Sequence, residues 1–74
     1  MSLRLKRLTL SATKLVPNRD HSDYGYGDSG MVQPGNIKLV DGIGPYRPEQ
    51  GCVWLQDDSH AYWEVSDEEF QRAI

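Results

Sequence analysis

The chain has 74 residues, a formal net charge of −3 and one cysteine, Cys52. This length fits one small domain, residues 1–74, which buries only about 60% of the surface of its unfolded chain. A lone cysteine excludes an internal disulfide framework and a four-cysteine zinc site. No apolar stretch approaches the roughly 20 residues of a membrane-spanning helix, so we expect a cytoplasmic protein without a membrane partner.

The first segment, residues 3–16, is expected to be extended. Its leucines change parity partway along, which predicts one long strand with a bulge near Lys6 and Arg7, or a bent pair of strands. Residues 1–19 carry five basic side chains and no acid, whereas residues 20–74 carry three basic and eleven acidic ones. Arg4, Lys6 and Arg7 are therefore a candidate steering patch. Alternatively, basic and acidic strands are neighbours in the sheet and partly cancel.

Residues 17–36 have almost no periodic apolar signal and contain four of the seven glycines and two of the four prolines. We expect a long loop here, and a loop of this length in a compact domain is either functional or simply mobile. Tyr24 and Tyr26 alternate with glycine, which suits protein contacts because it places large amphipathic rings on an adaptable backbone. We predict Tyr24, Tyr26 and Met31 as partner contacts. The alternative is an ordinary surface loop whose tyrosines fold back over the core.

Residues 37–40 form the next expected strand, which ends at Asp41-Gly42, a strong turn signal. The segment after it, residues 43–48, contains two prolines, which cannot donate to a β-ladder. An edge position or a surface connection is therefore expected. Tyr46 lies in this segment and is a further predicted contact residue.

Residues 52–56 and 61–65 are rich in β-branched and aromatic residues and flank a polar tetrad at 57–60, which predicts a tight antiparallel hairpin. With Asp58 and Ser59 at the tip, Trp54 falls opposite Trp63. Because side chains alternate across a strand, this register places both indoles on one face, which we expect to be the core.

A C-terminal helix is predicted from the capping box that Ser66 forms with Glu69. Val65 and Phe70 have the spacing of a hydrophobic staple, which fixes the direction in which the chain enters the helix. A helix this short is not stable alone in water, so it must pack on the sheet.

Catalytic and metal motifs are weak. The Gly-Asp-Ser-Gly at residues 27–30 resembles the nucleophile motif of chymotrypsin-like serine proteases over those four residues only. Met31 and Val32 stand where that family has Gly-Pro, and 74 residues are too few for its two β-barrels. Zinc would need Cys52, His21 and His60 to converge, and their spacing matches no closed zinc site. We therefore expect no enzyme activity, no metal and no cofactor.

Together the patterns predict a mainly β protein with a short C-terminal helix, built as a small antiparallel meander or an open SH3-like barrel. They favour a non-catalytic protein-binding module, an adaptor or small inhibitor of a larger macromolecule. The alternatives are a single-stranded nucleic-acid binder that uses the basic N-terminal strand, and a subunit of a homo-oligomeric or viral structural assembly. Small stand-alone proteins of this size often come from phages or other mobile elements. The predicted partner-binding residues are Tyr24, Tyr26, Met31, Tyr46, Arg4, Lys6 and Arg7.

Overall fold

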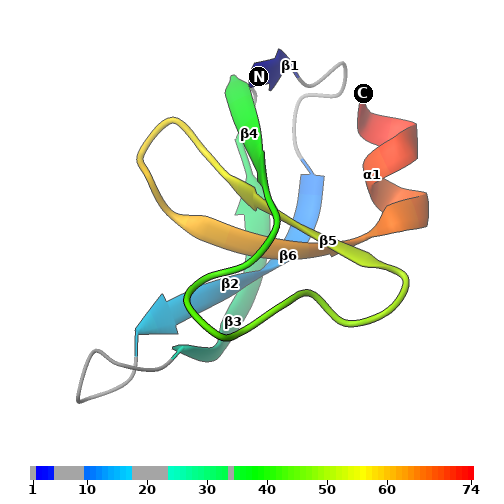
Figure 1. Cartoon of the computed structure of the whole chain (residues 1–74). Helices are drawn as coiled ribbons and strands as arrows, with labels where there is room; N and C mark the ends of the chain where they lie inside the picture. Colours follow the sequence, from blue (N-terminus) through cyan, green and yellow to red (C-terminus); the bar gives the residue numbers. More distant parts are fainter. Residues whose placement is uncertain (1, 5–9, 18–23, 34) are drawn as a thin grey trace.

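The computed structural model describes residues 2–4, 10–17, 24–33 and 35–74. The fold-class prediction is confirmed: within the described residues, six strands form one antiparallel sheet, followed by a short C-terminal helix (Figure 1). The elements in chain order are β1 (Ser2–Arg4), β2 (Leu10–Pro17), β3 (Tyr24–Val32), β4 (Asn36–Val40), β5 (Cys52–Gln56), β6 (Tyr62–Ser66) and α1 (Asp67–Ala73).

The strand order across the sheet is β1-β4-β5-β6-β2-β3. β4, β5 and β6 form a meander, and the antiparallel pair of β2 and β3 joins it along β6. Gly27 and Asp28 of β3 together lie opposite Lys14 of β2, because the register shifts between Thr13 and Leu15. Such an irregularity bends a strand and increases its local twist. The bulge predicted near Lys6 and Arg7 lies outside the described residues.

The prediction of a long loop at residues 17–36 is wrong for most of that range. Residues 24–32 form β3, while Pro17 ends β2 and Asn36 begins β4. This strand cannot be recognised in the sequence, because its glycines have no side chains and therefore leave no alternating apolar and polar pattern. A Cβ at Gly30 would lie 3.4 Å from the ring of Trp63, an ordinary contact distance, so this ring packs over the glycine.

The predicted β5–β6 hairpin is present, but the prediction that Trp54 lies opposite Trp63 is wrong. Trp63 pairs with Leu55, and Trp54 pairs with Glu64. A shift of one residue moves the whole set of side chains of a strand to the other face of the sheet. The two indoles therefore lie on opposite faces, and only one of them belongs to the main core.

The turn between β5 and β6 explains the shift. It spans residues 57–61, and Asp57 organises it from inside. The Oδ1 atom of Asp57 accepts hydrogen bonds from the backbone N–H of Ser59 at 2.9 Å and of Ala61 at 3.0 Å. His60 adopts a positive φ of 71°. This side-chain cap stabilises a longer turn than the two-residue tip that the sequence favoured.

The main core lies on one face of the sheet, and α1 covers it. Phe70 and Ala73 of α1 are buried there, and the helix packs against β2, β5 and β6. The cap is as predicted, because Ser66 Oγ accepts a hydrogen bond from the Glu69 backbone N–H at 3.2 Å. The remaining buried residues of this cluster are Leu10, Ala12, Val32, Ile37, Leu55, Trp63 and Val65.

Candidate binding site

Trp54 lies at the base of a second apolar cluster, on the face of the sheet opposite the main core. Its side chain is buried, as is that of Leu15 on β2. The connection between β4 and β5, residues 41–51, runs past this face and contributes Tyr46 to the cluster (Figure 1). Two backbone hydrogen bonds between Ile43 and Tyr46, of 2.9 and 3.0 Å, hold that connection in a tight turn.

A pocket of about 110 Å³ opens above Trp54. Segments far apart in the sequence build it: its lining residues come from β2, β3, β5 and residues 46–47 of the β4–β5 connection. Its opening is accessible, because the side chains of Tyr26 and Tyr46 are 55% and 37% exposed. The residues that line it are Leu15, Tyr24, Gly25, Tyr26, Tyr46, Arg47 and Trp54.

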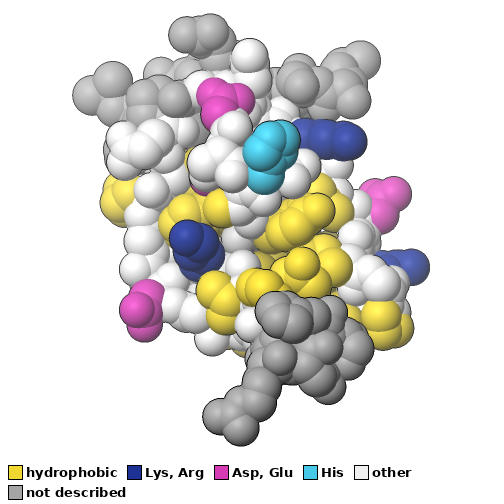
Figure 2. All heavy atoms as spheres, turned by 90° about the vertical axis from the view of Figure 1, so that its left-hand side faces the viewer, with side chains coloured by type: hydrophobic (Ala, Val, Ile, Leu, Met, Phe, Trp, Pro, Cys, Tyr) yellow, Lys and Arg dark blue, Asp and Glu magenta, His cyan; other side chains and the backbone are white. Residues whose placement is uncertain are grey.

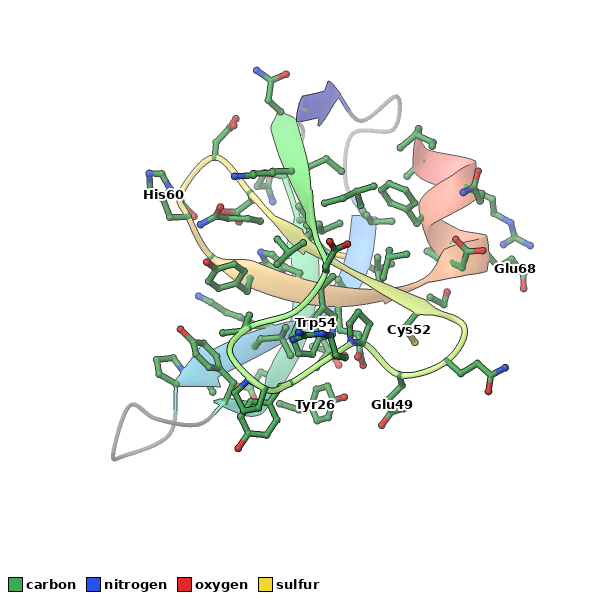
Figure 3. All side chains as sticks on the ribbon, viewed as in Figure 1. Tyr26, Glu49, Cys52, Trp54, His60 and Glu68 are labelled. Carbon is green, nitrogen blue, oxygen red and sulfur yellow. The ribbon has the colours of Figure 1, made fainter. Side chains whose placement is uncertain are left out.

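Glu64 on β6 links the side chains of Trp54 and Tyr26. Its Oε1 atom accepts a hydrogen bond from Trp54 Nε1 at 2.8 Å and one from the hydroxyl of Tyr26 at 3.2 Å. Desolvation of the hydroxyl, together with the charge and hydrogen bond of Glu64 and the charge of Glu49, raises the pKa of Tyr26 to about 12. Figure 3 shows Tyr26 and Trp54 on the same side of the β5–β6 ribbon, with Glu49 beside them.

Neighbouring residues also contact Tyr24 and Tyr46, the other two tyrosines of the lining. Tyr24 packs edge-on against Tyr62 of β6, with ring centroids 6.1 Å apart and an interplanar angle of 88°. Such aromatic pairs contribute about 0.5–1.5 kcal/mol beyond their buried area. Arg47 Nη1 donates hydrogen bonds to the carbonyl oxygens of Gly44 at 2.8 Å and Tyr46 at 3.0 Å. These contacts thus fix Tyr24 against β6 and the Arg47 side chain against the backbone of residues 44–46.

The structure brings together three of the residues predicted as contacts. Tyr24, Tyr26 and Tyr46 all line the pocket. Met31 is 49% exposed but lies further along β3, opposite Ser11, and is not part of the lining. The basic patch is not tested: Arg4 lies in β1, at the sheet edge remote from β3, and the structure does not describe its side chain, whereas Lys6 and Arg7 lie outside the described residues.

Sequence reasoning missed Trp54, Leu15 and Arg47 as pocket residues. The register expected from the sequence places Trp54 with Trp63 in the core and therefore away from any pocket. Arg47 carried a usable signal, because it follows Tyr46 in a proline-flanked connection that was already expected on the surface. Only the observed pairing of Trp54 with Glu64 shows which face of β5 the pocket occupies.

Trp63 on the other face is anchored in a similar way, by Asp57. The Nε1 atom of Trp63 donates a hydrogen bond to Asp57 Oδ2 at 2.8 Å. Burial favours the neutral carboxyl group, but hydrogen bonds from Ser59, Trp63 and Ala61 outweigh it and lower the pKa of Asp57. The partners of this carboxylate all belong to the β5–β6 hairpin, so its role is structural.

No group of three or more His, Cys, Asp and Glu side chains within the described residues is arranged to hold a metal ion. In the same part of the chain, no helix is long and apolar enough to cross a membrane. Comparison with known proteins adds no family assignment, because no protein-family model, curated protein or solved structure matches the chain.

Proposed function

We propose that the protein is a non-catalytic protein-binding module, an adaptor or small inhibitor of a larger macromolecule, and that the pocket above Trp54 is its contact site. One observation carries the proposal: tyrosines from two segments far apart in the sequence converge with a tryptophan and an arginine on one accessible pocket. Tyrosine, tryptophan and arginine are the residue types that contribute most of the binding energy at protein interfaces.

The size of the pocket favours a protein partner over a small-molecule substrate. Its volume of about 110 Å³ is well below the roughly 300 Å³ at which typical small-molecule pockets begin. A pocket this small accommodates one inserted side chain, while the exposed rings of Tyr26 and Tyr46 in its lining remain for a wider contact. Figure 2 shows hydrophobic side chains gathered below the histidine of the β5–β6 turn, on the side of the molecule that faces left in Figure 1.

Two expectations from the sequence are wrong: Trp54 and Trp63 do not share a face of the sheet, and Tyr24 and Tyr26 do not lie in a loop. The tyrosines are presented by a strand and by a tight turn instead. This arrangement favours binding, because groups held in place before binding lose less conformational entropy when the partner arrives.

Partner capture from the native host tests the proposal. Tyr26→Ala should weaken retention of the specific partner about thirtyfold, as expected for an interface residue that contributes 2 kcal/mol. Leu39→Ala is the matched control, because Leu39 is 46% exposed, similar to Tyr26, but lies on β4 outside the pocket lining. Equal capture by the wild type and both variants would show that the pocket is not the contact site.

A homo-oligomeric assembly is a second candidate, and the position of β3 favours it. β3 has nine residues and stands at an edge of the sheet. An edge strand of this length can pair with a strand of another chain. Light scattering over a range of concentrations distinguishes a growing assembly from a monomer. The nucleic-acid alternative depends on Arg4, Lys6 and Arg7 and stays a prediction.

A further inference from the structure

The pocket offers a potential ligand mainly the faces and edges of aromatic rings. Within the described residues, four such rings line it, from Tyr24, Tyr26, Tyr46 and Trp54. Two of their polar groups are already used inside the protein, because Trp54 Nε1 and the Tyr26 hydroxyl both donate to Glu64. A carboxylate entering here would receive no hydrogen bond from these two donors and would meet the negative charge of Glu64 behind them.

The charges around the pocket favour a cation. Glu64 lies directly behind the rings of Trp54 and Tyr26, and the negative charges of Glu64 and Glu49 both act on the Tyr26 hydroxyl. Arg47 is the one charged residue of the described lining and has the opposite sign; its Nη1 atom donates hydrogen bonds to the carbonyl oxygens of Gly44 and Tyr46, and its positive charge remains. Among the described residues, two carboxylates, those of Glu64 and Glu49, thus oppose the one guanidinium of Arg47 near the Tyr26 ring.

Aromatic faces attract ammonium groups through the negative potential above the ring, and clusters of such rings bind quaternary ammonium groups. The same protein already shows this interaction on its other face, where Lys14 Nζ lies 5.9 Å from the centroid of the Trp63 ring. The volume of about 110 Å³ suits one compact head group.

From the ring geometry and this charge balance, we infer that the pocket receives an alkylammonium side chain, a lysine or a methylated lysine, from the partner protein. The inference rests on the proposed function, because it specifies which group of the partner enters the same pocket. It also predicts the sign of two substitutions that a neutral or an anionic ligand would not share.

Titration of the folded protein with tetramethylammonium chloride, followed by NMR at the Trp54 indole N–H, tests the inference. We expect a saturable shift that equal concentrations of sodium chloride do not reproduce. We expect none from tert-butanol, which has a similar shape but no charge. Glu64→Gln keeps an acceptor oxygen for Trp54 and should weaken binding about three- to tenfold. Arg47→Gln removes the like charge and should strengthen it by a similar factor.

Absence of a saturable shift, an equal response to tert-butanol, or an unchanged or opposite effect of either substitution would overturn the inference. Backbone amide spectra of both variants establish that the fold is intact. The proposed function is tested separately, by partner capture. If Tyr26→Ala abolishes capture while tetramethylammonium does not bind, the pocket remains the contact site and only the identity of the inserted group is wrong.

Discussion

Each of the two tryptophans pairs its buried indole N–H with a carboxylate. A buried indole N–H needs an acceptor, since leaving it unpaired costs about 1–3 kcal/mol. Trp54 uses Glu64 and Trp63 uses Asp57, each at 2.8 Å. The consequences differ because the faces differ. On the core face the pair fixes the β5–β6 turn, whereas on the other face it places a carboxylate behind an accessible pocket.

Asp57 should make stability depend on pH in the acidic range. Its pKa is lowered in the folded state, so its ionised form contributes stability above the unfolded value of about 3.9. That contribution is lost as the pH falls from there through the folded pKa. We therefore expect the difference in unfolding free energy between wild type and Asp57→Asn to be constant near neutral pH and to shrink below about pH 4.

Urea unfolding at a series of pH values measures this difference. Trp63→Phe serves as the control, because it removes one hydrogen-bond donor to Asp57 but leaves those of Ser59 and Ala61. Its pH dependence should be reduced but still present. A difference between wild type and Asp57→Asn that stays the same across the acidic range would contradict the role assigned to this carboxylate.

At this scale the predicted contact residues stay predictions, and the structure shows only where the described ones lie. Tyr24, Tyr26 and Tyr46 were selected by composition, and the structure places all three on one pocket. Trp54 was misplaced because the register of a hairpin depends on its turn. The hydrogen bonds of Asp57 inside that turn depend on three-dimensional geometry, which a list of polar residues at 57–60 does not reveal.

At the scale of elements, β3 depends on its glycines to different degrees. A Cβ on Gly27 would lie 3.1 Å from Val16 Cγ1 and 3.2 Å from the Lys14 carbonyl oxygen, which is closer than ordinary packing allows. A Cβ on Gly30 would meet the Trp63 ring at 3.4 Å, an ordinary contact distance. Alanine substitutions at Gly27 and Gly30 therefore serve as a test and its control within one strand.

We expect Gly27→Ala to lower the free energy of unfolding by about 1–3 kcal/mol, because the backbone of β2 cannot easily move away. Gly30→Ala should be neutral or should stabilise by up to about 1 kcal/mol, since alanine restricts the unfolded chain. Chemical denaturation of both variants measures the difference. If Gly30→Ala proved the more damaging, the described packing of β3 on β2 would be wrong.

The C-terminal helix should depend on its cap. Ser66→Ala removes the acceptor of the Glu69 N–H and should reduce the free energy of unfolding by about 1 kcal/mol. Gln71→Ala, at an exposed position of the same helix, should change it by less than about 0.5 kcal/mol. Urea denaturation followed by circular dichroism compares the two. Equal effects would mean that the cap contributes nothing specific.

Elements that have a local sequence signal were predicted correctly, whereas β3, which has none, was missed. The capping box of Ser66 and Glu69 predicted α1, and closely spaced β-branched and aromatic residues predicted β5 and β6. β3 has no such signal. Its glycines are accommodated by Val16 and Trp63, which come from other strands. That fit is a property of tertiary packing, so no local reading of residues 24–32 could reveal it.

For the whole molecule, the main result is that one sheet buries apolar side chains on both faces. α1 covers the first face, whose core includes Trp63. On the second face, Trp54 and Leu15 are buried beneath tyrosines and the β4–β5 connection. The prediction of a single core could not anticipate this division. The main core and the candidate binding pocket therefore lie on opposite faces, and each has its own tryptophan.

Nuclear Overhauser contacts of the two indole rings in the folded protein test this division most directly. We predict contacts from Trp54 to Leu15 and Tyr26, and from Trp63 to Gly30, with none between the indoles. Contacts between the two indoles, or from Trp54 to the α1 residue Phe70, would place both tryptophans in one core and contradict the account.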